Sequence, residues 1–323
     1  MSENYAISAD NLQKNFGDVC AVNNVSLHVK PGEIYGLVGP DGAGKTTTMR
    51  LLVGALKLGA GKVSLCGFPL ASQLEQARGT VGYLSQRFSL YEDLTVLENI
   101  RFFAELRGLK PDAWMPRCME ILEFVGLAVY KDRRAGQLSG GMRQKLGLAS
   151  SLVSRPRILL LDEPTTGVDP VTRQDFWQLL IRLVMDKPGD TKQVHDEKVA
   201  VLISTPYMDE AARCNRIGFM RQGSIIAEGA PSEIRSILDG RVVELRGTPL
   251  PQMRILASQE ADVEDVRAFG DRLHLRVRQG SADKVLARLR KTLPAGGVNL
   301  LDARMIPPVL EDVFIVLSES ENA

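Results

Sequence analysis

Hydrophobic and polar positions follow two different patterns in the first part of this chain. Residues 6–16 and 26–30 contain short alternating segments, which are typical of antiparallel strands. The segment 32–39, GEIYGLVG, reads as an apolar strand that ends in glycines, and 46–56, TTTMRLLVGAL, has the spacing of a helix. The first strong unit is therefore a strand, a loop and a helix.

A helical pattern follows over residues 96–127. Its apolar residues are spaced for two helix faces, one with Leu97, Ile100, Phe103 and Leu106, the other with Cys118, Ile121, Leu122 and Val125. We therefore expect a helical insert at about residues 87–150.

Apolar strands return at 157–162 and 199–205, with a helix at 171–184 between them and a polar loop at 186–198. This alternation predicts a parallel sheet.

Short strands at 241–247, 272–279 and 298–306 and a helix at 281–293 predict a second, small α+β domain, joined by a link at 228–240. The fold class is α/β, with a mixed or parallel sheet core, an antiparallel β subdomain and the helical insert. The predicted domains are 1–232 and 240–318.

The composition limits the partners and the cellular location that we expect for the protein. The 323 residues include 40 basic and 39 acidic side chains, so the net charge of +1 gives no field toward nucleic acid. The start of the chain does not resemble a secretory signal, and no run reaches the ~20 apolar residues of a membrane span. If the protein works at a membrane, we expect another chain to supply the spans. The four scattered cysteines fit reduced structural thiols in a cytoplasmic protein.

The segment GPDGAGKTT satisfies the phosphate-loop pattern G-x-x-x-x-G-K-[ST], with the strand before it and the helix after it that the motif requires. Its glycines let backbone N–H groups turn inward toward phosphate oxygens, and the helix start adds its positive end. Lys45 would reach the β- and γ-phosphates, and Thr46 would bind Mg²⁺. Asp41 is unexpected beside a triphosphate, and it reads equally well as an outward turn residue or as a functional one. The predicted nucleotide-binding residues here are Gly39, Pro40, Asp41, Gly42, Ala43, Gly44, Lys45, Thr46 and Thr47.

Two acids stand where the apolar strand 157–162 stops. Asp162 can hold Mg²⁺ directly or through water, and Glu163 can act as the general base that polarises the attacking water.

These features, together with LSGGMRQK at 138–145, resemble the ATPase subunits of the ATP-binding cassette family, whose signature motif stands in this position. The resemblance covers residues 5–230 and implies a P-loop NTPase cassette that binds ATP and Mg²⁺. Ser139, Gly140 and Gly141 would open a helix whose N-terminus is a second anion site. In this family that site reaches the γ-phosphate held by a second ATPase subunit.

The resemblance assigns three more residues. Phe16 matches the aromatic residue that stacks on adenine. Gln86 matches the glutamine that touches Mg²⁺ and water and links the nucleotide to the helical insert. Asp169 matches the loop that communicates across the dimer.

The segments 85–106 and 307–317 are similar to exporter ATPases for drugs, polysaccharides and related compounds. The expected partners are a second ATPase subunit, identical or different, and a membrane-spanning permease, with no nucleic acid. The expected location is the cytoplasmic face of the membrane. A soluble cassette ATPase without a transport role and a regulatory ATP-binding module are the alternatives. The expected role of the small domain is accessory, in assembly or dimerisation.

One position departs from the family pattern. The family has a histidine after the strand that ends in Ser-Thr, and that histidine contacts the γ-phosphate; here the residue is Pro206. Proline has no side-chain donor and no backbone N–H. Two interpretations follow. In the first, which we favour, the site hydrolyses ATP slowly and serves as the weak half of an asymmetric pair. In the second, Glu163 and Gln86 suffice for hydrolysis at an ordinary rate. The first resembles the N-terminal half of tandem cassette ATPases, where a serine can replace the histidine.

Overall fold

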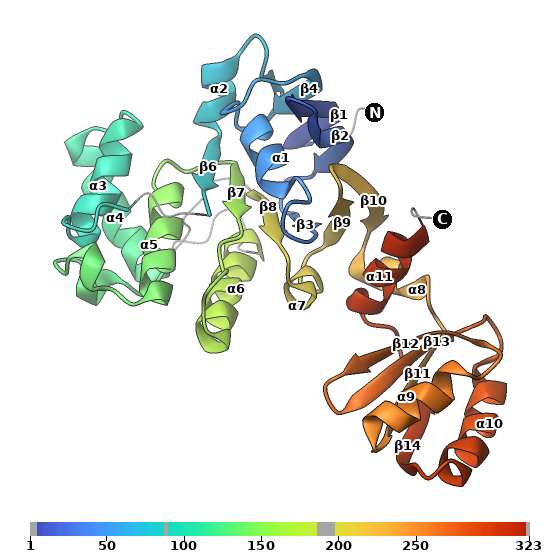
Figure 1. Cartoon of the computed structure of the whole chain (residues 1–323). Helices are drawn as coiled ribbons and strands as arrows, with labels where there is room; N and C mark the ends of the chain where they lie inside the picture. The colour runs from blue at the N-terminus through green and yellow to red at the C-terminus, as the bar shows by residue number, and fades with distance from the viewer. Residues whose placement is uncertain (1–4, 87–89, 186–197, 321–323) are drawn as a thin grey trace. The chain divides into compact units, whose positions relative to one another are not determined.

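A computed structural model describes residues 5–86, 90–185 and 198–320 (Figure 1). Residues 87–89 of the predicted helical insert, and all of the predicted loop 186–198 except Lys198, lie outside the described residues. Contacts between residues divide the chain into two units, 1–230 and 231–323. The division falls inside the segment 228–240 that the sequence predicts as a link.

The central sheet of the first unit has six strands in the order β10-β9-β3-β8-β7-β6. Their bounds are β3 (Ile34–Val38), β6 (Val81–Leu84), β7 (Ile158–Asp162), β8 (Ala200–Thr205), β9 (Arg216–Arg221) and β10 (Ser224–Gly229). Neighbours from β9 to β6 are parallel, and β10 pairs antiparallel with β9. Every residue of β3, β7 and β8 is buried, as expected for strands covered on both faces. The predicted parallel sheet is confirmed.

A second, antiparallel sheet of the first unit has the order β2-β1-β4-β5. Its strands are β1 (Ile7–Phe16), β2 (Val19–Val29), β4 (Ala60–Leu65) and β5 (Phe68–Pro69); the helices nearby in sequence are α1 (Lys45–Leu52) and α2 (Leu74–Gly79). Met49, Leu51 and Leu52 of α1 share one apolar core with residues of both sheets. This packing fixes the start of α1, and with it the predicted phosphate loop.

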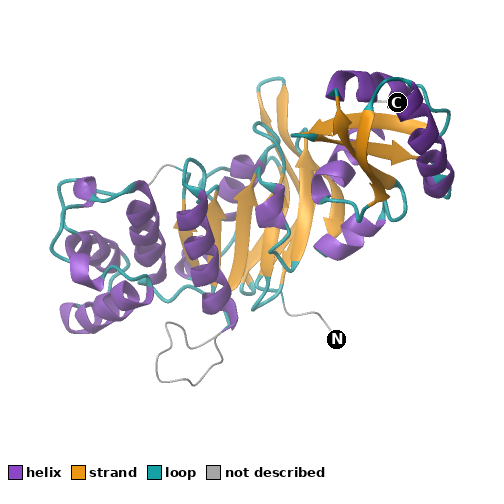
Figure 2. Cartoon of the chain, turned by 90° about the horizontal axis from the view of Figure 1, so that it is seen from below, coloured by secondary structure: helices purple, strands orange, loops and turns teal. Residues whose placement is uncertain are grey.

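Helices fill the segment between β6 and β7, and its described residues form no strand (Figure 2). The elements are α3 (Val96–Leu106), α4 (Pro111–Phe124), η1 (Ala128–Tyr130), η2 (Ala135–Gln137) and α5 (Gly140–Leu152). The predicted buried face of α4 is confirmed, since Cys118, Ile121, Leu122 and Val125 are all buried.

The predicted face of α3 is partly wrong. Its buried side chains are Val96, Asn99, Ile100 and Ala104, whereas Leu106 is 69% exposed. The spacing of apolar residues did not predict Asn99, a polar residue, on the buried face. Its side-chain amide can be buried because it forms hydrogen bonds with the backbone of Tyr91.

The first unit is completed by α6 (Pro170–Met185) and α7 (Met208–Ala211). The second unit begins with α8 (Pro231–Ser236), so the predicted link is partly helical; Ile234 and Leu238 of this segment are buried.

The sheet of the second unit has the order β12-β13-β11-β14 and is antiparallel. Its elements are β11 (Val242–Thr248), α9 (Leu250–Ser258), β12 (Val263–Phe269), β13 (Arg272–Val277), α10 (Ala282–Ala295), β14 (Asn299–Met305) and α11 (Leu310–Ser320). The three predicted strands and the helix 281–293 are present. Sequence reasoning missed α9, which starts beside two prolines, and β12, an edge strand in which Val266 is the one buried residue.

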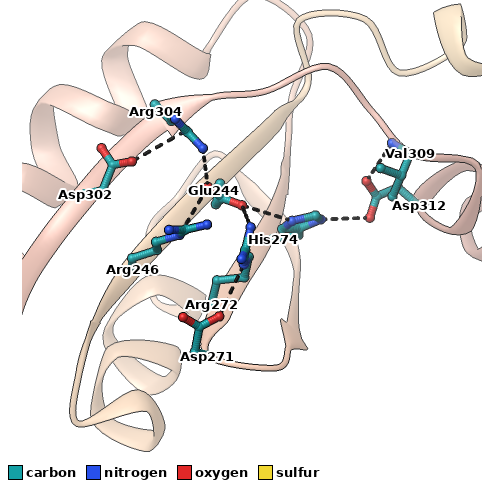
Figure 3. Close-up of polar contacts among 9 residues, drawn as sticks. All are labelled: Glu244, Arg246, Asp271, Arg272, His274, Asp302, Arg304, Val309 and Asp312. Atoms are coloured by element: carbon teal, nitrogen blue, oxygen red, sulfur yellow. Dashed lines mark hydrogen bonds and ion pairs between the residues drawn. The ribbon is translucent and has the colours of Figure 1, made fainter.

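A polar cluster joins three strands of this second sheet to α11 (Figure 3). Glu244 on β11 is 4% exposed and accepts hydrogen bonds from Arg272 and Arg304, both at 2.9 Å. His274 lies 3.7 Å from Glu244 and 3.4 Å from Asp312, which caps the start of α11 by accepting from the backbone of Val309. Burial opposes ionisation of Glu244, but the two arginine hydrogen bonds outweigh it and lower its pKa.

All four cysteines are free. Burial raises the pKa of Cys118 to about 11 and that of Cys214 further, so these two thiols stay protonated at neutral pH, as structural residues do. Across the described ranges, no helix combines the length and the apolar character needed to cross a membrane.

We predict that Glu244→Gln destabilises the second unit by about 1 to 2 kcal/mol at neutral pH, because two arginines lose a charged acceptor. Since the pKa of Glu244 is lowered on folding, its contribution is fully present above the unfolded-state pKa of about 4.3 and is lost as the pH falls from there through the lower folded-state pKa. Hydrogen exchange of β11 and β13 should therefore be faster in the variant at neutral pH, and the difference from wild type should shrink as the pH is lowered below about 4. The exposed Asp239→Asn is the control, and a difference that does not shrink at the lower pH would contradict this account.

Candidate active site

Three strand ends meet at one edge of the central sheet. Strands β3, β8 and β7 are parallel neighbours, so their carboxyl ends lie side by side, with Val38 opposite Thr205 and Asp162 opposite Ser204. The phosphate loop follows β3, Glu163 follows β7 and Pro206 follows β8. This edge is where open α/β sheets bind ligands.

The phosphate loop needs glycine at specific positions. A Cβ at Gly39 would stand 2.1 Å from the carbonyl oxygen of Met220, and one at Gly44 would stand 2.4 Å from that of Ala21. Gly42 and Gly44 have φ of +77° and +105°, which side-chain-bearing residues rarely adopt. A Cβ at Gly42 would meet nothing within 4 Å, so the loop leaves open space on that side.

Lys45 stands at the centre of the site and is 4% exposed. Its ammonium donates to the carbonyl oxygens of Gly39 and Pro40, at 2.8 and 2.9 Å, and lies 3.1 Å from Oε1 of Glu163. The loop that would bind phosphate and the predicted base are therefore joined through one cation.

Asp162 is held by three hydroxyl groups. Its Oδ1 accepts from Thr46 at 3.0 Å and from Ser204 at 2.8 Å, and its Oδ2 accepts from Tyr83 at 3.4 Å. Burial and the neighbouring Asp162 carboxylate raise the pKa of Tyr83 to about 12, so the phenol keeps its proton and donates.

Sequence reasoning missed Ser204 and Tyr83. A signal for Ser204 was present, because two predicted parallel strands end in Asp and in Ser-Thr, and parallel strand ends share an edge.

Glu163 stands just past the end of β7 with φ of +49°, a conformation uncommon for residues other than glycine. Its backbone N–H donates to Oγ of Ser204 at 3.0 Å. Its Oε2 accepts from Gln86 at 3.1 Å and from Thr166 at 3.4 Å. Three residues are predicted to be catalytic: Glu163, Gln86 and Lys45. In the structure both Gln86 and Lys45 contact Glu163 directly.

The phosphate loop, Gln86 and Glu163 border a cavity of about 290 Å³. It is lined by Ala21, Asp41, Gly42, Ala43, Gly44, Lys45, Thr46, Thr47, Gln86 and Glu163. Ala21 is an addition to the predicted set, brought here by β2. Asp41 lines the cavity and is exposed to solvent, so its carboxylate stays hydrated near the loop.

The oxygen atoms fit a magnesium ion. Thr46 and Asp162 place a hydroxyl and a carboxylate together, and Gln86 keeps its amide oxygen as an acceptor while its nitrogen bonds Glu163. The described residues contain no group of three or more His, Cys, Asp or Glu side chains able to hold a metal. An ion here would therefore need oxygens from phosphate and water to complete its coordination, as Mg²⁺ usually does.

Eight predicted residues do not line the cavity. Three of them contact residues that do: Gly39 and Pro40 accept from Lys45, and Asp162 accepts from Thr46. The other five are Phe16, Ser139, Gly140, Gly141 and Asp169. Phe16 ends β1, is 49% exposed and lies 5.3 Å from the ammonium of Lys14. Ser139 caps α5 by accepting from the backbone of Met142 at 3.3 Å.

Gly140 is exposed, and Gly141 packs on α6, where a Cβ would stand 2.1 Å from Thr172. Asp169 accepts from the backbone N–H of Thr172 at 3.0 Å, and that bond lowers its pKa. The signature segment and the Asp169 loop are therefore joined to each other through Thr172.

Comparisons with known proteins agree with this geometry. Residues 22–166 match the family described as ABC transporter. The Nod factor export ATP-binding protein I of Cupriavidus metallidurans is 38% identical over 313 residues, which cover 96% of this chain and 96% of that protein. The probable multidrug ABC transporter ATP-binding protein YbhF of Escherichia coli (strain K12) is 37% identical over 285 residues, 81% of this chain; the match spans 47% of YbhF, about half its length.

A dimeric structure of a bacterial ABC transporter cassette superposes with a TM-score of 0.61 at 27% identity, covering 69% of this chain and 98% of that one. The phosphate loop, the acidic strand end and the signature segment stand in one cassette fold. The chain belongs to the ABC transporter family, as one of its ATP-binding proteins.

Proposed function

We propose that this chain binds Mg-ATP, hydrolyses it and so drives a membrane-embedded exporter of drugs or similar compounds. The observation that carries the proposal is the contact of Lys45 with both the phosphate loop and Glu163, beside a Thr46–Asp162 pair suited to Mg²⁺. The relatives support export in particular, because one is named for Nod factor export and one for multidrug transport.

The side chains divide the chemistry between them. Lys45 and the loop N–H groups hold the β- and γ-phosphates, and Thr46 and Asp162 hold the metal. Mg²⁺ would neutralise charge on the phosphate oxygens. Glu163 accepts the proton of the attacking water, and Gln86, bonded to Glu163, orients both that water and the base.

We further propose that the site is completed by a second ATPase subunit. Ser139 and Gly140 are exposed and do not line the cavity of their own chain, so they are free to meet the γ-phosphate of a partner chain. Asp169 would act across the same interface. Phe16, exposed at the end of β1, would stack on adenine.

A second cavity, of about 350 Å³, supports a permease partner. It lies between β6 and the helices α3 and α5, and its lining includes Leu90, Phe103 and the 69% exposed Leu106. The lining combines apolar side chains with several serines and Arg107, and a partly apolar groove of this kind fits an amphipathic helix of another protein. We therefore place the permease here and the chain on the cytoplasmic face of the membrane, as a peripheral subunit. The second unit would assist assembly.

Pro206 favours a slow site. It follows β8 at the edge where the cavity opens, and the side-chain donor that the family uses there is missing. A regulatory module with negligible turnover is the extreme form of this proposal.

We predict that Lys45→Ala abolishes ATP binding, because the phosphates lose their cation and the carboxylate of Glu163 is left unpaired beside them. Labelled-ATP binding measures this directly. The exposed Lys57→Ala is the control and should bind normally. Retained micromolar affinity in Lys45→Ala would overturn the nucleotide assignment.

We predict that Glu163→Gln lowers hydrolysis by about a hundredfold or more and traps an ATP-bound dimer, because the base is lost while the contacts to phosphate remain. Gel filtration with Mg-ATP and any partner subunit tests it. Glu75→Gln, at an 83% exposed glutamate, is the control. A monomer at saturating ATP would count against the dimeric site.

We predict that Pro206→His raises turnover several-fold with little change in ATP affinity, because a donor to the γ-phosphate matters most where charge develops. Pro206→Ala, which restores only the backbone N–H, is the matched control. Steady-state ATPase is measured with any partner site silenced. If the wild-type turnover is already typical of the family and Pro206→His does not change it, the site does not need this donor.

A further inference from the structure

Glu210 is a fully buried acid beside the proposed site. It lies on the short helix α7, four residues after Pro206, and its side chain is 0% exposed. Its Oε1 accepts from Oγ1 of Thr165 at 2.5 Å, and its Oε2 accepts from Oγ1 of Thr205 at 2.6 Å. A buried carboxylate is tolerated only when it is bonded in this way, so both oxygens are committed.

The two hydroxyls belong to the segments that carry the chemistry. Thr165 stands two residues after Glu163, in the turn that leaves β7. Thr205 is the last residue of β8; its carbonyl accepts from the backbone of Gly39 at 3.3 Å, and its hydroxyl accepts from the backbone of Tyr207 at 3.1 Å. Glu210 therefore joins the base-bearing turn to the strand end that adjoins the phosphate loop.

Arg173 adds helix α6 to this network. Its Nε lies 3.6 Å from Oε1 of Glu210, and its guanidinium stands 4.3 Å from the ring centre of Tyr207. It also pairs with Asp209 at 3.8 Å. The Glu210 network therefore contacts the turn that leaves β7, at Thr165, and the first turn of α6, at Arg173.

We propose that Glu210 is a positioning residue for ATP hydrolysis, acting through Thr165 and Thr205 to hold Glu163 in register with the phosphate loop. This inference rests on the proposed ATPase function. It explains how the turn after β8 keeps its place although Pro206 can donate no hydrogen bond. An amide at position 210 offers one acceptor oxygen and one NH₂ group, so one of the two hydroxyls would lose its acceptor and would have to turn its lone pair toward the NH₂ group instead.

The test compares Glu210→Gln with wild type in ATP binding and in steady-state turnover. A displacement of the base by a fraction of an ångström should lower kcat by about tenfold or more and change the affinity for ATP less than about threefold. Thr165→Val breaks one link and leaves the other, and it should lower kcat in the same direction by a smaller factor. Thr165→Val therefore tests the same inference if Glu210→Gln does not fold.

Two controls separate positioning from stability. Glu33→Gln alters another buried, ion-paired acid of the same unit, and it should lower the Tm without lowering kcat. In a Glu163→Gln background, Glu210→Gln should cause little further loss, since it acts through the residue already removed. Unchanged kcat in folded Glu210→Gln and Thr165→Val, losses that add to those of Glu163→Gln, or parallel losses of affinity and rate would each overturn the inference. Absence of ATP binding by wild type would instead overturn the proposed function.

Discussion

The parallel pairing of β3, β8 and β7 is the constraint on which the site depends. Each strand is followed by a different functional segment, and only a parallel arrangement puts all three at one edge. The register matters as much as the order, because Asp162 lies opposite Ser204 and bonds it. A shift of one residue would turn Asp162 to the other face of the sheet and separate it from Thr46.

The same edge contains a buried pair of opposite charges. Lys45 and Glu163 have side chains that are 4% and 7% exposed, and burying either ion alone would be costly. Each is stabilised by the other and by neutral partners, the carbonyls of the loop for Lys45 and the amide of Gln86 for Glu163. A phosphate that binds Lys45 competes with Glu163 for the same ammonium. On the function proposed above, the bound nucleotide would therefore release the base from its ion pair.

The local motifs were predicted from the sequence, whereas most of their partners were not, and for Ser204 the signal lay in the pairing of two predicted strands. The phosphate loop and the acidic strand end can be recognised in a short stretch of sequence, because the conformation of glycine and the end of a strand depend on neighbouring residues. Ser204, Tyr83 and Ala21 reach the site through strand register and packing, which depend on residues far apart in the chain. The same limit explains the wrong face of α3, where a buried amide took a core position, and the missed β12 and α9 of the second unit.

The proline at 206 is compatible with the fold because the bonds that anchor its turn use its neighbours. Thr205 supplies a carbonyl to Gly39 and a hydroxyl to Glu210, and Tyr207 supplies the next backbone donor. None of these bonds needs an N–H at position 206. Structural and chemical demands on this turn are thus carried by different residues, so a substitution that removes a phosphate contact need not loosen the turn.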